Sequence, residues 1–211
     1  KQKTAYEIRN CDWSSDVCSS DLLPLGDPSG AANGLVGSAA AGGFPTRVAN
    51  SLFRAAAGKN VALYNNAGIL NLLEFSNVVF KDTRNRPLGS EGFLIETRNG
   101  ASASVSFADC VFQNHATRGI RASANGQSLI AMTVARSEFI DNTEGISLEN
   151  ADDADIAFDI DGNHFSNTLA AGASGAAVAS TNPASASANA IQAGKIRNNR
   201  IDGGGIDNNL I

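Results

Sequence analysis

The sequence predicts an all-β solenoid, a parallel β-helix of about five coils, on three observations. A block with two apolar residues five positions apart recurs along the chain. A shorter block, in which a glycine precedes alternating apolar residues, recurs between its copies. The segments before the first block alternate between apolar and polar residues, as in strands that bury one face. Helices are not expected, because glycine interrupts every candidate for a helical pattern.

The two blocks recur at nearly the same period. The first occurs as FSNVVFKD from Phe75, FADCVFQN from Phe107, VARSEFID from Val134, IDGNHFSN from Ile160 and IRNNRIDG from Ile196. Its second apolar residues are spaced by 32, 27, 26 and 36 positions. The glycine block occurs as GFLIE from Gly92, GIRAS from Gly119, GISLE from Gly145 and GAAVA from Gly175. A repeat of about 27 residues with three short strands and three turns fits one coil of a parallel β-helix.

Stacked coils should align equivalent side chains in columns. One predicted inner column contains Phe80, Phe112, Phe139, Phe165 and Ile201, and a second contains Phe75, Phe107, Val134, Ile160 and Ile196. Two residues after each column phenylalanine stands Asp or Asn, namely Asp82, Asn114, Asp141 and Asn167. Because Asp and Asn tolerate a left-handed backbone, we expect these four residues to form a ladder at one turn.

The composition argues against disorder and against two classes of partner, nucleic acid and the lipid bilayer. Hydrophobic residues make up 43% of the 211 residues and the net charge is -5, which argues against disorder. An acidic chain is not expected to bind nucleic acid, and no apolar stretch approaches the roughly 18 residues needed to span a bilayer.

The first 22 residues differ from the rest. KQKTAYEI and CDWSSDVCSSDL resemble the translated codons of a short-read sequencing adapter, so residues 1–22 are expected to be a non-native, disordered segment. Setting them aside removes three basic and four acidic residues and leaves 13 basic and 17 acidic residues. It also removes Cys11 and Cys18, so that Cys110 stands alone. Residues 23–51 are predicted as an irregular lead-in or partial coil, and residues 52–211 as a β-helix fragment truncated at both ends.

The blocks resemble a known group of repeats. SEFIDN from Ser137, GISLE from Gly145 and GNHFSN from Gly162 look like repeats of right-handed, single-stranded parallel β-helix proteins of the pectin-lyase-like superfamily. More narrowly, they resemble the large bacterial surface and secreted β-strand-repeat proteins, and the resemblance covers roughly residues 61–201. It implies an extracellular or cell-surface location associated with the outer membrane.

One acidic segment is the main candidate for a metal site. It contains Asp152, Asp153, Asp155, Asp159 and Asp161, and alternation should direct Ile156, Phe158 and Ile160 inward. Asp155, Asp159 and Asp161 should therefore face solvent. They could bind calcium, but the spacing only superficially echoes a calcium loop, since the twelfth position is Ala170 rather than Glu. A solvated acidic face is the preferred interpretation.

Other chemistry-bearing residues are scattered. His115 and His164 are predicted at turns, and Cys110 is predicted as a small filler because it occupies the position of Val78, Ser137 and Asn163 in other coils. The arginines that could share a face are Arg98, Arg118, Arg121 and Arg136, and they are expected to be solvated partners of Asp and Glu.

The sequence favours a non-catalytic structural or adhesive scaffold of a secreted or cell-surface bacterial protein, with no catalytic, cofactor or metal residue assigned. Its expected partners are neighbouring coils of a longer parent chain and cell-surface glycans or a host surface, without nucleic acid or membrane insertion. The alternative is a fragment of a carbohydrate-active β-helix enzyme, a polysaccharide lyase or glycoside hydrolase, whose site lies outside the fragment.

Overall fold

The computed structural model describes residues 35–39, 46–85, 90–166, 176–181 and 189–202. Its strands form three six-stranded parallel sheets. Sheet A contains β1 (Leu35–Ala39), β4 (Val61–Asn65), β7 (Phe93–Thr97), β10 (Arg118–Ala124), β13 (Glu144–Asn150) and β16 (Val178–Thr181). Sheet B contains β2 (Thr46–Ala49), β5 (Ile69–Ser76), β8 (Ser102–Ala108), β11 (Leu129–Ala135), β14 (Asp155–Asp161) and β17 (Gln192–Arg197). Sheet C contains β3 (Leu52–Arg54), β6 (Val79–Lys81), β9 (Val111–Gln113), β12 (Glu138–Ile140), β15 (His164–Ser166) and β18 (Arg200–Asp202).

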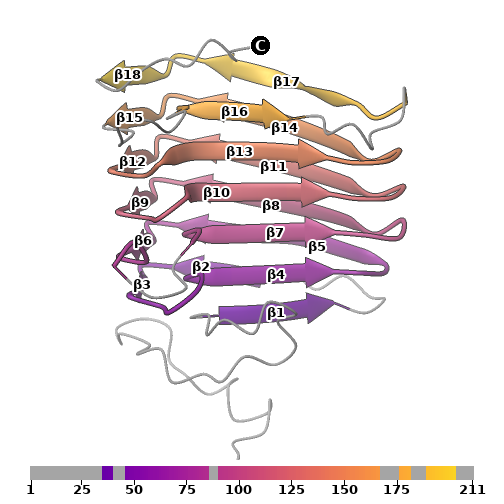
Figure 1. Cartoon of the computed structure of the whole chain (residues 1–211), viewed down its shortest axis with the longest axis horizontal. Helices are drawn as coiled ribbons and strands as arrows, with labels where there is room; N and C mark the ends of the chain where they lie inside the picture. Colours follow the sequence, from indigo (N-terminus) through magenta and orange to yellow (C-terminus); the bar gives the residue numbers. More distant parts are fainter. Residues whose placement is uncertain (1–34, 40–45, 86–89, 167–175, 182–188, 203–211) are drawn as a thin grey trace, which may run out of the picture.

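The chain visits sheets A, B and C in turn and rises by one strand at each pass, so every set of three strands is one right-handed coil (Figure 1). The predicted all-β parallel β-helix is therefore confirmed. The described residues form six coils, where the repeats indicated about five. The additional coil contains β1, β2 and β3, and its Val48 and Phe53 continue the two inner columns.

Both predicted inner columns are confirmed by the register of the strands. Phe80, Phe112, Phe139, Phe165 and Ile201 occupy equivalent positions in sheet C, and Phe53 extends this column by one coil. Neighbouring rings from Phe80 to Phe165 are stacked with centroids 4.7–4.9 Å apart. This spacing equals the distance between adjacent strands, so backbone pairing and ring stacking favour the same register.

The glycine block has a steric cause. A Cβ atom on Gly119 would lie 2.8 Å from the ring of Phe139, and one on Gly145 would lie 2.6 Å from the ring of Phe165. Each glycine therefore makes room for the column phenylalanine of its own coil. The register aligns Ile146 with Val178, so the residue equivalent to Gly145 is Ala177. The assignment of Gly175 to this ladder was wrong, because the described strand register places Ala177 at this position and so departs from the period of about 27 residues.

The turn ladder after sheet C is confirmed for the described residues. Asp82, Asn114 and Asp141 have φ values of 64°, 58° and 54°, in the left-handed region. The Asn114 Nδ2 atom donates to Asp82 Oδ1 at 3.1 Å, so neighbouring rungs bond to each other. Asn167, the fourth predicted rung, lies outside the described residues.

A second polar ladder runs inside the corner between sheets B and C. The backbone N–H of Cys110 donates to Ser137 Oγ at 3.1 Å, that of Ser137 to Asn163 Oδ1 at 2.8 Å, and that of Asn163 to Asn199 Oδ1 at 2.8 Å. Each coil therefore supplies the acceptor that the preceding coil needs at this buried corner.

Candidate functional site

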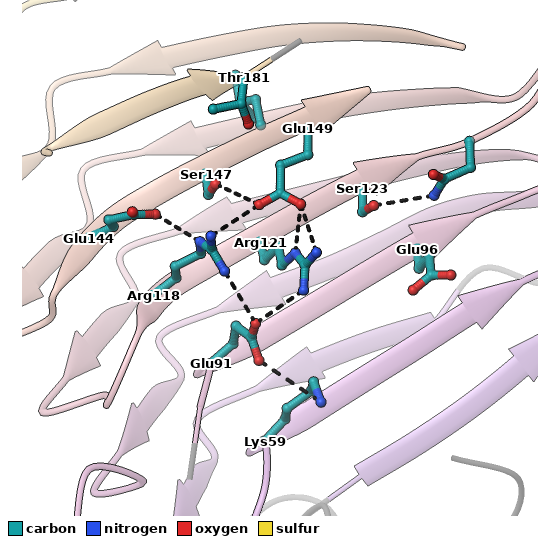
Figure 2. Close-up of polar contacts among 12 residues, drawn as sticks. Lys59, Glu91, Glu96, Arg118, Arg121, Ser123, Glu144, Ser147, Glu149 and Thr181 are labelled. Carbon is teal, nitrogen blue, oxygen red and sulfur yellow. Dashed lines mark hydrogen bonds and ion pairs between the residues drawn. The ribbon is translucent and has the colours of Figure 1, made fainter. Parts of the chain in front are cut away.

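Charged side chains from four successive coils meet along sheet A and the turns that lead into it (Figure 2). We call this group the Glu91 network, and it comprises Lys59, Glu91, Arg118, Arg121, Glu144 and Glu149. Arg118 and Arg121 belong to β10, and Glu144 and Glu149 belong to the neighbouring strand β13. Glu91 lies directly before Gly92 at the entry to β7. The parallel register places these strands side by side, which brings residues about 27 positions apart into contact.

The arginines hold the network together. Arg118 Nε lies 2.7 Å from Glu144 Oε2, and Arg118 Nη2 lies 3.2 Å from Glu149 Oε1. Arg121 Nη2 lies 2.7 Å from Glu149 Oε2. Burial alone would lower the pKa of Arg121, but the adjacent Glu149 carboxylate offsets this effect and leaves that pKa above its usual value. Arg121 is therefore a permanent cation within the network.

Glu91 is the most buried member of the network, with 3% of its surface exposed. Its Oε1 atom lies 3.7 Å from Arg118 Nη1 and 3.5 Å from Arg121 Nη1, while Lys59 Nζ is 3.9 Å from Oε2. These are ion-pair distances rather than short hydrogen bonds, and Oε2 has no hydrogen-bond partner among the described residues. Three carboxylates thus face three cations, and the network is electrically balanced.

Only the two arginines of this network were predicted from the sequence. Arg118 and Arg121 do share a face, but Arg136 pairs with Asp109 at the opposite corner and Arg98 pairs with Glu96. The glutamates and Lys59 were missed. A signal was present, because Glu91, Arg118 and Glu144 each stand directly before a ladder glycine, so that the charge alternates from coil to coil at one position.

The acidic segment of β14 is bonded to the following coil. Arg197 Nη2 lies 3.1 Å from Asp159 Oδ2, and Arg197 Nε lies 3.3 Å from Asp161 Oδ2. Asn198 Nδ2 also donates to Asp161 at 2.8 Å. These aspartates are thus ion-paired rather than simply solvated. Within the described ranges, no group of three or more His, Cys, Asp and Glu side chains could hold a metal ion.

The inward assignment of β14 needs one qualification. Ile156 and Ile160 are fully buried, as predicted. Phe158 is only half-buried, although it packs against the core. It pairs with Gly194 of the next coil, where an added Cβ would lie 2.5 Å from the Phe158 ring.

The two histidines differ. His115 is buried in the turn after β9, where Nδ1 lies 3.0 Å from Thr83 Oγ1 and Nε2 lies 3.1 Å from the carbonyl oxygen of Phe80. Burial lowers the pKa of His115 to about 4, so the ring is neutral at pH 7. The turn assignment of His164 was wrong, because this residue begins β15 and its Nε2 atom lies 2.9 Å from Asp202 Oδ2.

Cys110, expected as a small turn residue or semi-buried filler, is fully buried. It is 1% exposed, and burial raises the pKa of its thiol to about 11. A thiol that stays protonated and inaccessible is a poor nucleophile.

Comparisons of the chain with protein-family models, curated proteins and solved structures found no match. No helix in the described part of the chain is long and apolar enough to cross a membrane.

Proposed function

We propose that this chain is a non-catalytic structural or adhesive scaffold of a secreted or cell-surface bacterial protein, built on a β-helix of the pectin-lyase-like type. The observation that carries the proposal is the balanced Glu91 network. A catalytic carboxylate or a substrate-binding arginine must be free to meet its substrate. In this network the arginine donors are already engaged by carboxylates of neighbouring coils.

Other ion pairs also join adjacent coils. Arg54 pairs with Asp82, and Arg136 pairs with Asp109, each across adjacent coils. Arg197 does the same for β14. Single exposed pairs contribute only about 0–1 kcal/mol each, but charge pairing between successive coils also disfavours slipped registers. A surface whose charges fasten one coil to the next suits a protein that supplies length and a regular outer face.

The cellular location and partners belong to the same proposal. The S-x-F-x-N block and the coil architecture resemble those of bacterial surface and secreted repeat proteins, which supports an extracellular location. Small outward side chains such as Ser104, Ala131 and Ala157 on sheet B leave a smooth face against which cell-surface glycans or a host surface could lie.

One observation favours a second candidate, a carbohydrate-active β-helix enzyme. Glu91 Oε2 has no hydrogen-bond partner although the residue is almost fully buried. Buried carboxylates with unmet hydrogen-bonding capacity are found among catalytic acids. In this alternative, Glu91 would exchange a proton with a bound polysaccharide.

Substitution of Glu91 separates the two candidates. For the scaffold, Glu91→Gln should lower the free energy of unfolding by about 1–3 kcal/mol, since it leaves three cations facing two carboxylates. The matched control is Glu138→Gln, at the exposed first residue of β12, which should change the free energy of unfolding by less than about 0.5 kcal/mol. Neither the unsubstituted chain nor either variant should release reducing ends from neutral or acidic polysaccharides. Turnover that is lost in Glu91→Gln would establish the enzyme, and an unchanged stability would remove the basis of the scaffold proposal.

A further inference from the structure

The last described coil exposes residues that every preceding coil buries. Ile196 and Ile201 continue the two inner columns, yet they are 41% and 42% exposed. Their counterparts one coil earlier, Ile160 and Phe165, are at most 2% exposed. In the first coil the column residue Phe53 is 5% exposed. Incomplete burial of the columns is therefore confined to the edge formed by β17 and β18, which we call the β17–β18 edge.

The sheet A side of this coil is closed by polar groups instead. Ser180 and Gln192 replace Leu148 and Ile156 of the preceding coil, and their side chains are hydrogen-bonded to each other. Gln192 Nε2 also donates to Asn150 Oδ1 at 2.7 Å. Among the described inner-column positions of this coil, those left exposed, Ile196 and Ile201, therefore lie at the corner between sheets B and C, while the exposed Ile191 stands before β17 outside the columns.

The corner between sheets B and C carries the same side-chain to backbone hydrogen bonds at each successive coil interface. Asn163 accepts from the backbone N–H of Ser137, and Asn199 accepts from that of Asn163. A further coil would place an acceptor side chain over the backbone of Asn199 by the same rule. The β17–β18 edge therefore offers to a further strand the same contacts that join the described coils.

The charge of the β17–β18 edge indicates which kind of strand would bind there. The edge carries Lys195, Arg197 and Arg200 and one carboxylate, Asp202, which pairs with Arg200, whereas β14 carries three aspartates. The existing interface pairs acidic β14 with basic β17 through Arg197. An acidic strand is consequently the complement of the β17–β18 edge.

We propose that the β17–β18 edge binds a parallel β-corner, meaning two strands joined by a bend. Its apolar residues are five positions apart, an Asn or Ser stands three positions after the first, and its outward residues are acidic. Binding adds a strand to sheets B and C through backbone hydrogen bonds and covers Ile196 and Ile201. The proposal rests on the proposed scaffold function, since it describes how the scaffold is extended by another coil.

The chain itself contains a segment with the required chemistry, which serves as the probe. A fluorescein-labelled peptide with the sequence of residues 155–166, DIAFDIDGNHFS, has acidic outward residues, the apolar pair and the corner asparagine. Its anisotropy should rise saturably when the full chain is added. A peptide with Asn163→Ala should bind at least about tenfold more weakly, because the acceptor for the edge backbone is lost.

Variants of the chain place the binding at the edge. Ile201→Asp should weaken binding of the peptide at least about tenfold, and Ile196→Ser provides a second test if Ile201→Asp fails to fold by circular dichroism. The matched control is Ile69→Asp, because Ile69 is 52% exposed and is the first residue of β5, which does not belong to the β17–β18 edge. This control should bind as the unsubstituted chain does.

Three results would overturn the proposal. They are the absence of saturable binding, equal binding by the Ile201→Asp and Ile69→Asp variants, and self-association of the chain that Ile201→Asp abolishes without any peptide binding. The last result would identify a second copy as the occupant. None of them would alter the effect of Glu91→Gln, so a failure of this inference is distinguishable from a failure of the scaffold proposal.

Discussion

Truncation of Phe139 tests the stacked column most directly. Phe139 is 2% exposed and lies between two parallel rings, with centroids 4.9 Å from Phe112 and 4.7 Å from Phe165. Phe139→Ala removes the buried ring and both stacked contacts. Truncating a buried phenylalanine costs about 3–5 kcal/mol, and each stacked pair contributes about 0.5–1.5 kcal/mol beyond its buried area. We therefore expect a loss in the upper part of that range.

The assay is chemical denaturation followed by circular dichroism, with the midpoint and slope fitted together. For a chain of this size, the same loss should lower Tm by about 6–20 °C. Ile69→Ala is the control, because it truncates an apolar side chain that is 52% exposed, and it should cost less than about 1 kcal/mol. A loss below about 1 kcal/mol for Phe139→Ala, or equal losses in the two variants, would refute the inward assignment of the column.

Three further perturbations address the corners and the glycine ladder. Gly145→Ala should destabilise the chain by about 1–3 kcal/mol in the same assay, since its Cβ would lie 2.4 Å from the carbonyl oxygen of Ala177; a neutral effect would contradict the close approach. Because burial lowers the pKa of His115 from 6.5 to about 4, the unfolded chain takes up the proton first. Stability should therefore fall by about 3 kcal/mol between pH 6.5 and 4. His115→Asn, which matches Asn142 of the next coil, should flatten this dependence, and an unchanged pH profile would exclude His115 as its cause. Cys110→Ser should take up as much Ellman's reagent as the unsubstituted chain in native buffer and one equivalent less in denaturant, whereas a native-state difference would show that the thiol is accessible.

The repeats predicted the fold because stacking makes three-dimensional order visible in one dimension. Each coil returns to the same position after about 27 residues, so a column such as Phe80, Phe112 and Phe139 is also a periodic sequence pattern. The glycine block is visible for the same reason, as each ring requires an absent Cβ nearby. Where the period is broken, as before β16, the sequence alignment chose Gly175 and the strand register chose Ala177.

The candidate site could not be predicted to the same extent. Charges within a network need only be complementary, so its members alternate in sign and type from coil to coil instead of repeating. Glu91 and Arg118 occupy the same position before a glycine, but nothing local indicates that their side chains meet. The pairing of Arg197 with Asp159, 38 residues away, likewise depends on which coil follows β14.

The sequence by itself determined the all-β class, the coil length, the two inner columns and the left-handed turn rungs, because each depends on residue types that recur with the coil. Only the tertiary structure decided the sixth coil, the balanced Glu91 network, the engagement of the β14 aspartates and the exposure of Ile196 and Ile201. These features arise from contacts between different residues on adjacent coils, and such contacts depend on the register in which parallel strands pair.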